Sequence, residues 1–253
     1  IFVKHPALIL FSIIFLHLLM PLWAYFLATV IFDDHLLTIG FVLSVAVPIG
    51  VSSVIWINMC KGNLPLGLSI ILIDTVLSPL VMPGLVHIVA GDTIHVDIWP
   101  MMVDLLLMIV LPSIAGVLVN EWTDARVSKT MAATFAPFSK ISLFLIVMIN
   151  SSAIAPYVEN ITWELAKIIA VVFFVALSGY VICYVVGKLV WKDEELVVTF
   201  VFTGGMRNIS AGVVLATTYF PGKVVMPVVF GMLFQQILAS QFHRLLMKRQ
   251  ERA

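Results

Sequence analysis

The segment PIGVSS at residues 48–53 interrupts one long apolar run, and TGGMRN at residues 203–208 interrupts another. Pro48 removes a backbone hydrogen-bond donor, and Gly204 and Gly205 each weaken a helix by about 1 kcal/mol relative to alanine. Inside a membrane, such a break must be buried in protein or line a cavity, because lipid cannot bond to the freed backbone. Each break alone is equally compatible with an ordinary kink, since Gly and Pro are frequent in membrane helices.

The composition around these breaks points to a membrane. The chain has 253 residues, of which 62% are hydrophobic and 11% are charged. Soluble domains are about 45–50% apolar and about 25% charged, so this chain has too few polar residues to cover a water-soluble fold. Its 14 basic residues equal its 14 acidic ones, which gives no reason to expect a nucleic-acid partner. We expect a polytopic membrane protein whose main partner is the lipid bilayer.

Eight apolar runs are long enough to cross about 30 Å of hydrocarbon, which takes about 20 helical residues. They are residues 6–32, 36–60, 64–90, 98–120, 139–157, 163–187, 196–219 and 222–243. The mixed stretch 122–138 is typical of an amphipathic connector at the membrane surface. The predicted fold class is therefore all-α, a polytopic membrane helix bundle.

Basic residues collect in alternate loops, which predicts the orientation. One set holds Lys4, Lys61, Arg126, Lys129, Lys188, Lys192, Arg244, Lys248, Arg249 and Arg252, and the other holds Lys223 beside Asp33, Asp34, Asp92, Asp97 and Glu159. By the positive-inside rule, the first set is cytoplasmic. We therefore expect an integral protein of a bacterial plasma (inner) membrane, with both ends of this chain in the cytoplasm.

The two breaks occupy corresponding places in two groups of three spans. Spans one to three and spans six to eight each carry the break in the middle member, and the loop alternation runs these middle spans in opposite directions. Paired broken spans in inverted repeats are typical of a transporter with its site at the bilayer midplane.

These motifs resemble the bile acid:sodium symporter family. The resemblance is carried by residues 48–53, by KGN at 61–63, by LSPL at 77–80 with Pro83, and by GMRN at 205–208, which is similar to the family's Gly-Met-Gln-Asn segment. It implies a ten-helix inverted repeat whose two broken helices cross at the substrate and cation site. The eight spans then match helices three to ten, so we expect the first two helices of the template to be absent. It also implies core-domain halves at residues 1–97 and 158–253, with panel-domain spans at 98–157.

The resemblance further implies a sodium site, which this chain keeps only in part. The remaining candidate ligands are Ser53, Thr203 and the backbone carbonyls near Gly204 and Met206, while the family's glutamine is replaced by Arg207. A fixed guanidinium repels a cation that needs several oxygens. We expect no cofactor, and the coupling ion stays open between Na⁺ and H⁺.

Three ionisable residues lie well inside predicted spans, namely His17, Asp74 and Arg207. A charge at the bilayer centre costs about 2.5–3.5 kcal/mol, so it usually faces protein or a cavity and has a role. We expect Asp74 and Arg207 to pair or to share a water-filled pocket. The pair is either purely structural, or Arg207 binds a substrate carboxylate through its planar fork while Asp74 exchanges a proton. His17 is either hydrogen-bonded within the bundle or a proton carrier.

The function predicted from these features is secondary active transport of a small organic anion by alternating access. The expected substrate-binding residues are Ser52, Ser53, Thr203, Arg207 and Asn208, and the expected coupling or ion-pair residues are Asp74, Arg207 and His17. The chain has no motif of a metalloprotease, a serine hydrolase or a P-loop ATPase, so we expect no enzyme. The alternatives are a sodium-coupled symporter of bile-acid-like substrates, and a non-transporting sensor or channel of the same fold. The oligomeric state stays open.

Overall fold

A computed structural model describes residues 5–91, 97–152, 155 and 162–250. Every named element in these ranges is a helix, and five helical segments are long and apolar enough to cross a membrane. The five segments are Pro6–Ile31, Leu64–Ala90, Ile98–Trp122, Trp163–Val190 and Gly222–Lys248. The predicted fold class, an all-α membrane helix bundle, is confirmed.

The helices follow the predicted spans, except that the helix at Arg126–Ser152 begins well before the predicted span 139–157, whose residues 153–154 and 156–157 lie outside the described residues. In chain order they are α1 (Pro6–Ile14), the π-helical turn η1 (Phe15–Leu19), α2 (Met20–Ile31), α3 (His35–Ala46), α4 (Ser53–Met59), α5 (Leu64–Ala90), α6 (Ile98–Leu105), the π-helical turn η2 (Leu106–Val110), α7 (Leu111–Trp122), α8 (Arg126–Ser152), α10 (Trp163–Val190), α11 (Glu194–Gly205), α12 (Ile209–Tyr219) and α13 (Gly222–Gln250). The breaks separate α3 from α4 and α11 from α12, as predicted from the proline and the glycine pair.

The prediction of a surface connector at residues 122–138 is wrong. Helix α8 runs without interruption from Arg126 to Ser152. The stretch contains no glycine, and its one proline, Pro137, lies inside the helix without ending it. The helical periodicity therefore continues from the polar start of α8 into its apolar part.

Both π-helical turns end two residues before a proline. Turn η1 ends at Leu19, before Pro21, and turn η2 ends at Val110, before Pro112. Proline cannot donate to the carbonyl four residues back, and its ring collides with that carbonyl. A widened turn relieves this collision while keeping the helix continuous, and π-turns are frequent at functional sites.

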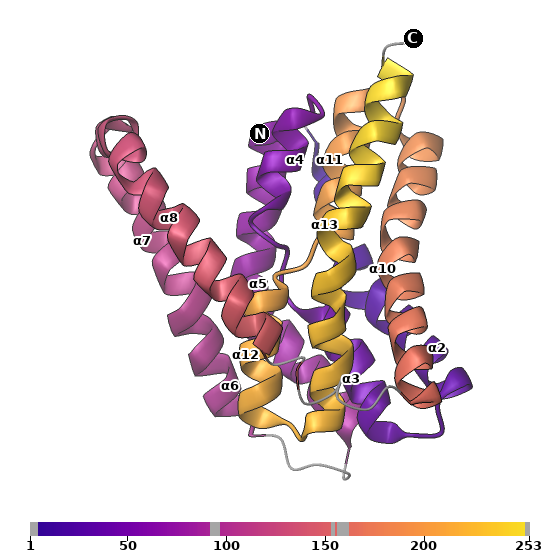
Figure 1. Ribbon diagram of the computed structural model, residues 1–253. Helices are drawn as coiled ribbons and strands as arrows, with labels where there is room; N and C mark the ends of the chain where they lie inside the picture. The colour runs from indigo at the N-terminus through magenta and orange to yellow at the C-terminus, as the bar shows by residue number, and fades with distance from the viewer. Residues whose placement is uncertain (1–4, 92–96, 153–154, 156–161, 251–253) are drawn as a thin grey trace.

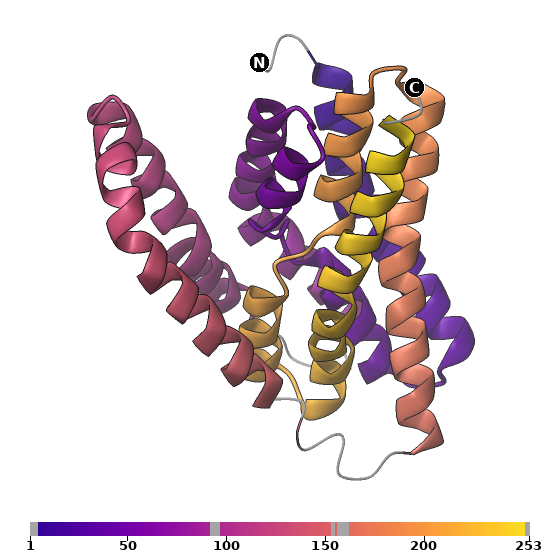
Figure 2. The same ribbon diagram turned by 45° about the horizontal axis from the view of Figure 1, so that its top comes forward.

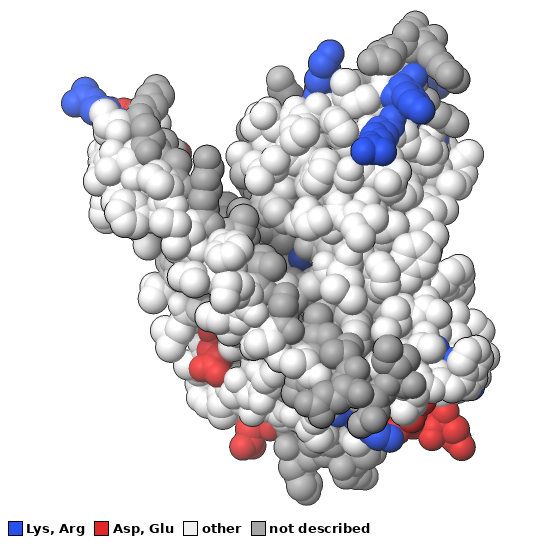
Figure 3. Space-filling model, viewed as in Figure 1, with Lys and Arg blue, Asp and Glu red and all other residues white. Residues whose placement is uncertain are grey.

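The α7–α8 hairpin leans away from the other helices, as Figures 1 and 2 show from two directions. Helices α2, α3, α10, α11 and α13 pack side by side in the main body, with α10 against α11 and α3 against α13. Figure 3 shows a hollow between the hairpin and this body. The division into core-domain halves and panel-domain spans stays a prediction.

Charged side chains divide between the two ends of the bundle. In Figure 3, Lys and Arg dominate the end where the α7–α8 tip and the chain's C-terminus lie, while Asp and Glu lie mainly toward the opposite end. At that opposite end, Lys223 donates to Asp34 over 2.7 Å. The distribution matches the loop alternation in the sequence, and which end faces the cytoplasm stays a prediction.

Candidate functional site

The two helix breaks cross in the interior of the bundle. Ile49 and Arg207 face each other as an isolated antiparallel bridge. The N–H of Asn208 donates to the carbonyl of Pro48 over 2.7 Å, and the N–H of Gly50 donates to the carbonyl of Met206 over 3.3 Å. The broken helices therefore satisfy part of each other's backbone. We call the residues 47–52 and 206–208 together the crossing.

The central amide of each break is bound by a side chain from the long helix that comes after both halves of the broken span. The N–H of Ile49 donates to Asp74 Oδ2 of α5 over 2.6 Å. In the second break, the N–H of Arg207 donates to Gln235 Oε1 of α13 over 2.9 Å. The two halves of the crossing thus have the same backbone arrangement, with a carboxylate in one half and an amide in the other.

Glycine makes this close approach possible. A Cβ atom at Gly50 would lie 2.7 Å from the carbonyl oxygen of Arg207, which is a fixed backbone atom. A Cβ atom at Gly205 would lie 2.5 Å from the ring of Tyr180. Both distances are below those that real Cβ contacts reach, so the sequence must place glycine here for the two breaks to meet.

Backbone carbonyls hold the Arg207 guanidinium. Its Nε donates to the carbonyl of Val45 over 2.9 Å, and its Nη1 donates to the carbonyls of Gly204 over 2.9 Å and Met206 over 3.3 Å. Val45 and Gly204 lie in the last turns of α3 and α11, where carbonyls lack helical partners and the helix dipole is negative. A buried cation is therefore stabilised at the point where both broken helices end.

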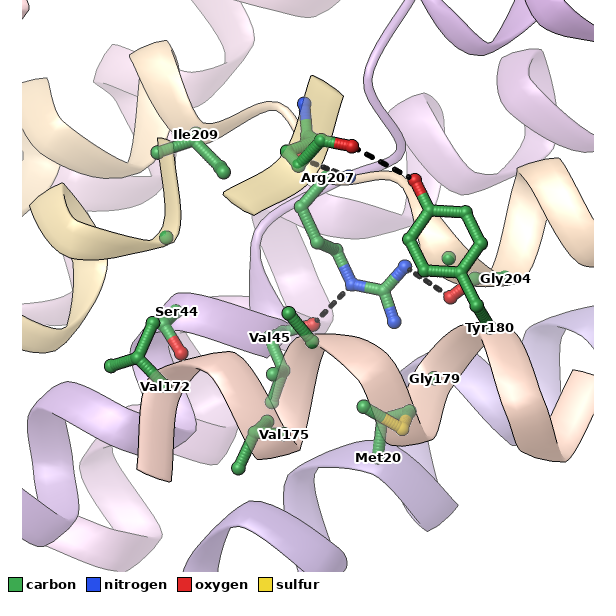
Figure 4. A pocket seen from close by; sticks show the side chains of 14 residues that line it. Met20, Ser44, Val45, Val172, Val175, Gly179, Tyr180, Gly204, Arg207 and Ile209 are labelled. Carbon is green, nitrogen blue, oxygen red and sulfur yellow. Dashed lines mark hydrogen bonds between the residues drawn. The ribbon is translucent and has the colours of Figure 1, made fainter. Parts of the chain in front are cut away.

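One part of the guanidinium stays open. Its Nη2, which carries two of the five N–H donors, has no hydrogen-bonding partner among the described residues. Figure 4 shows this third nitrogen without the bonds that the other two make. It lies on a cavity of about 40 Å³ whose wall includes Ser44, Tyr180 and Gln235. This volume suits water molecules, whereas sites for organic ligands usually measure about 300–1,000 Å³.

Three of the four predicted sodium ligands already have a protein partner in this structure, and the sodium site stays a prediction. The carbonyls of Gly204 and Met206 accept from Arg207, and the hydroxyl of Thr203 donates to the carbonyl of Thr199 over 2.9 Å. The guanidinium thus takes the oxygens that a sodium ion would need. Among the described residues, there is also no group of three or more His, Cys, Asp or Glu side chains that could hold a metal ion.

The direct ion pair expected between Asp74 and Arg207 is not what the structure contains. Asp74 Oδ1 instead lies 2.9 Å from Nε2 of His17, and these side chains are 1% and 9% exposed. Arg207 reaches carbonyls before it reaches the carboxylate, although its charge still attracts that of Asp74. All three ionisable groups lie in the interior, as predicted, but Asp74 contacts His17 instead of Arg207. The coupling roles of the three residues stay predictions.

The other predicted site residues have structural partners or lie outside the Arg207 cavity. Asn208 caps α12 by accepting from the N–H of Ala211 over 3.3 Å. Ser53 is fully buried, and its hydroxyl has no partner among the described residues. Ser52 precedes α4 without capping it. The roles of Ser52, Ser53, Thr203 and Asn208 in binding substrate stay predictions.

Gln235 and Tyr180 line the cavity but are not among the site residues predicted from the sequence. Gln235 binds the crossing, and the hydroxyl of Tyr180 donates to the Gln235 carbonyl over 3.4 Å. A signal for Gln235 did exist, because it is a polar residue in the middle of an apolar span, as Asp74 is in α5. Tyr180 has no such signal, since a tyrosine in an apolar helix is ordinary.

Comparisons with known proteins agree with this architecture. A family model described as the sodium bile acid symporter family matches residues 2–162. The uncharacterized protein YbaS of Bacillus subtilis (strain 168) is 47% identical over 240 residues, which cover 94% of this chain and 78% of that protein. The uncharacterized sodium-dependent transporter YocS of the same strain is 28% identical over 98% of this chain and 77% of its own length. A probable sodium/metabolite cotransporter, chloroplastic BASS1 of Oryza sativa subsp. japonica, is 24% identical over 79% of this chain and 48% of its own length.

Proposed function

We propose, from the premise that this chain belongs to the sodium bile acid symporter family, that it is a secondary transporter moving a small organic anion by alternating access. The family is one of membrane transporters, and the helices are long and apolar enough to span a bilayer. We also propose that the chain is not an enzyme. The chemical class of the substrate and the identity of the coupling ion are proposals as well. So is a location in a bacterial plasma (inner) membrane, which the Bacillus relatives support.

The observation that carries the proposal is the open face of Arg207. Arg207 is 6% exposed, and its guanidinium has three carbonyl acceptors and keeps Nη2 free beside a cavity. The two N–H groups of Nη2 can donate to a carboxylate or sulfonate, and in a site that excludes water the attraction between the opposite charges is strong. An anion of the substrate therefore has a fixed cationic partner at the crossing.

The small cavity requires a change of shape during transport. About 40 Å³ does not hold an organic anion, so the helices around Arg207 must separate before one binds. Because α3 and α11 both end at the guanidinium, movement of either helix changes the environment of Arg207. This arrangement supports alternating access, in which the site opens to one side of the membrane at a time.

Liposomes that contain the purified protein provide the test. A mixture of labelled monocarboxylates, dicarboxylates and sulfonates is added outside the liposomes, and the anions that accumulate inside are identified by mass spectrometry. We expect R207Q to abolish accumulation, because the neutral amide cannot neutralise an anion. R207K should retain a small fraction, because lysine keeps the charge but lacks the planar fork.

The matched control is R244Q, which removes an exposed arginine near the end of α13. It should transport like the original protein. Unchanged accumulation in a folded R207Q protein would overturn the proposal. Ohmic current instead of saturable uptake would favour a channel, and strict dependence on external sodium would favour the sodium-coupled symporter suggested by the names of the relatives.

A further inference from the structure

His17 and Asp74 form a buried acid–base pair apart from the Arg207 cavity. His17 lies in the π-helical turn η1, and its Nε2 is 2.9 Å from Asp74 Oδ1, which is close enough for an ion pair although the two atoms do not meet in hydrogen-bond geometry. The second ring nitrogen, Nδ1, is buried and has no hydrogen-bonding partner among the described residues. A neutral ring with its proton on Nε2 leaves the lone pair of Nδ1 available.

The carboxylate charge of Asp74 is not needed for the fold of the crossing. Gln235 binds the amide of Arg207 in the second half just as Asp74 binds the amide of Ile49 in the first half. An uncharged amide oxygen is therefore sufficient to hold the backbone. Keeping a charge inside the membrane is costly, and such residues usually serve ion or proton movement. The additional partner that distinguishes Asp74 from Gln235 is His17.

A second cavity gives the pair a connection toward one end of the bundle. It has a volume of about 240 Å³, and His17 and Tyr25 are the polar residues of its otherwise apolar wall. The other lining residues are Leu18, Pro21, Leu22, Val42, Leu85, Ile88 and Val89. Because Leu85, Ile88 and Val89 lie in the last turns of α5, the cavity extends from His17 toward the end where the Asp34 loop lies.

Few other ionisable groups act on the pair. Tyr25 of α2 lines the same cavity, and Arg207 of the crossing attracts Asp74. The described parts of α1, α4 and η2 contain no ionisable side chain. The ionisable side chains of α3, α6 and α11 have other positions or partners. His35 contacts Ala90, Asp104 accepts from Tyr219, and Glu194 and Glu195 begin α11.

We propose that the His17–Asp74 pair binds the proton that drives anion transport, so that this carrier is proton-coupled; the proposal rests on the transport function above. When movement of the surrounding helices exposes Nδ1 of His17 to water, a hydronium ion gives its proton to Nδ1 and leaves as water. The resulting imidazolium is held by the Asp74 carboxylate. On the other side of the membrane, water takes the proton from Nδ1, and the neutral ring returns.

Charge neutrality sets the stoichiometry. In the empty site, Arg207 and Asp74 cancel while His17 is neutral. A bound monoanion makes the buried charge negative by one, and a proton on His17 restores it to zero. Each ligand therefore favours binding of the other, because an uncompensated charge in a membrane interior is unfavourable. One proton accompanies one monoanion, and the cycle carries no net charge.

The first experiment measures proton binding without any substrate. The full chain with ¹⁵N-labelled histidine is studied in lipid by nuclear magnetic resonance across about pH 5–8, the range in which imidazole titrates. We expect a buried ring whose signal changes from neutral to imidazolium, is unchanged by added sodium chloride, and is lost in H17Q. The control H87Q removes an exposed histidine of α5 and should leave that signal in place. A His17 ring that keeps one form throughout overturns the proposal.

The second experiment links the proton to transport. Uptake of the labelled anion mixture is driven by an acid exterior at equal sodium concentrations. One proton per monoanion gives up to about tenfold accumulation per pH unit of gradient. D74N, whose amide can still accept from Ile49, should exchange anions without responding to the gradient. Accumulation that follows a sodium gradient and ignores pH overturns proton coupling. If no anion is taken up, the transport function fails while the substrate-free titration still decides the proton site.

Discussion

The two halves of the crossing share a backbone arrangement but differ in charge. In the first half, the central amide donates to the Asp74 carboxylate, which His17 also contacts. In the second half, the corresponding amide donates to the neutral Gln235, and the cation is Arg207 itself. Backbone geometry is therefore common to both halves, whereas the chemistry is divided between them. One half holds a permanent charge, and the other holds a group that can gain or lose a proton.

Gly50→Ala should have the largest effect, because it separates the two halves. The added Cβ would meet the Arg207 carbonyl at 2.7 Å, and this fixed backbone atom cannot rotate away. We expect the free energy of unfolding to fall by an amount at the upper end of about 1–3 kcal/mol, because the hydrogen bonds between the two breaks are weakened. Thermal unfolding in detergent measures the effect.

Gly84→Ala on α5 is the matched control. A Cβ there would meet no atom within 4 Å. It should leave stability unchanged or raise it by up to about 1 kcal/mol through helix preference. Equal midpoints for the two variants would contradict the close approach at the crossing.

Gln235→Met tests the second half alone. It removes the acceptor for the Arg207 amide, and an unpaired buried N–H costs about 1–3 kcal/mol. We expect a value near the lower limit, because Gln235 lines the cavity and water there can replace its oxygen. Hydrogen exchange at the Arg207 amide should also accelerate.

The neighbouring Gln236→Met gives the comparison. Gln236 is exposed and accepts from Trp56 Nε1 over 3.2 Å. Losing one such interhelical bond costs about 0.6 kcal/mol on average. A larger loss in Gln236→Met than in Gln235→Met would show that the crossing does not depend on Gln235.

We expect the smallest effect for the surface pair of Asp34 and Lys223. This pair serves as a reference for a carboxylate beside a base outside the membrane interior. Burial alone would raise the pKa of Asp34, but the hydrogen bond and charge of Lys223, with the amides of Leu36 and Leu37, lower it below its ordinary 3.8. The folded state thus favours the carboxylate. Its stabilising contribution is complete above pH 3.8 and disappears as the pH falls through the lowered pKa.

D34N isolates this contribution, because asparagine still caps α3 but carries no charge. The unfolding midpoint of the original protein should exceed that of D34N at neutral pH, and the difference should shrink in acid. Salt should also reduce it, since the pair is exposed. A difference that is constant from neutral to acidic pH would exclude Asp34 as its source.

Sequence patterns were sufficient to predict the helices of this molecule and the two breaks in them. Pro48 and the glycines at 204 and 205 located both breaks, and apolar run lengths located the spans. Burial of His17, Asp74 and Arg207 also followed, because each interrupts an apolar run. These features depend on local composition, which can be read directly from the sequence.

The partners of the buried charges could not be predicted in the same way. Arg207 is held by carbonyls of Val45, Gly204 and Met206, and every residue type has a carbonyl. Which carbonyls are free depends on where helices end and how they cross. The contact between His17 and Asp74 likewise depends on the rotation of one helix against another, and the π-helical turn η1 alters that rotation.

Turn η1 therefore makes the contact between His17 and Asp74 sensitive to the deletion of a single residue. A π-turn holds one residue more than an α-turn, so deletion of a single residue within Phe15–Leu19 restores regular helical pitch. One residue corresponds to about 100° around a helix axis. Such a deletion would rotate the segment before it relative to α2 while leaving composition and hydrophobicity almost unchanged.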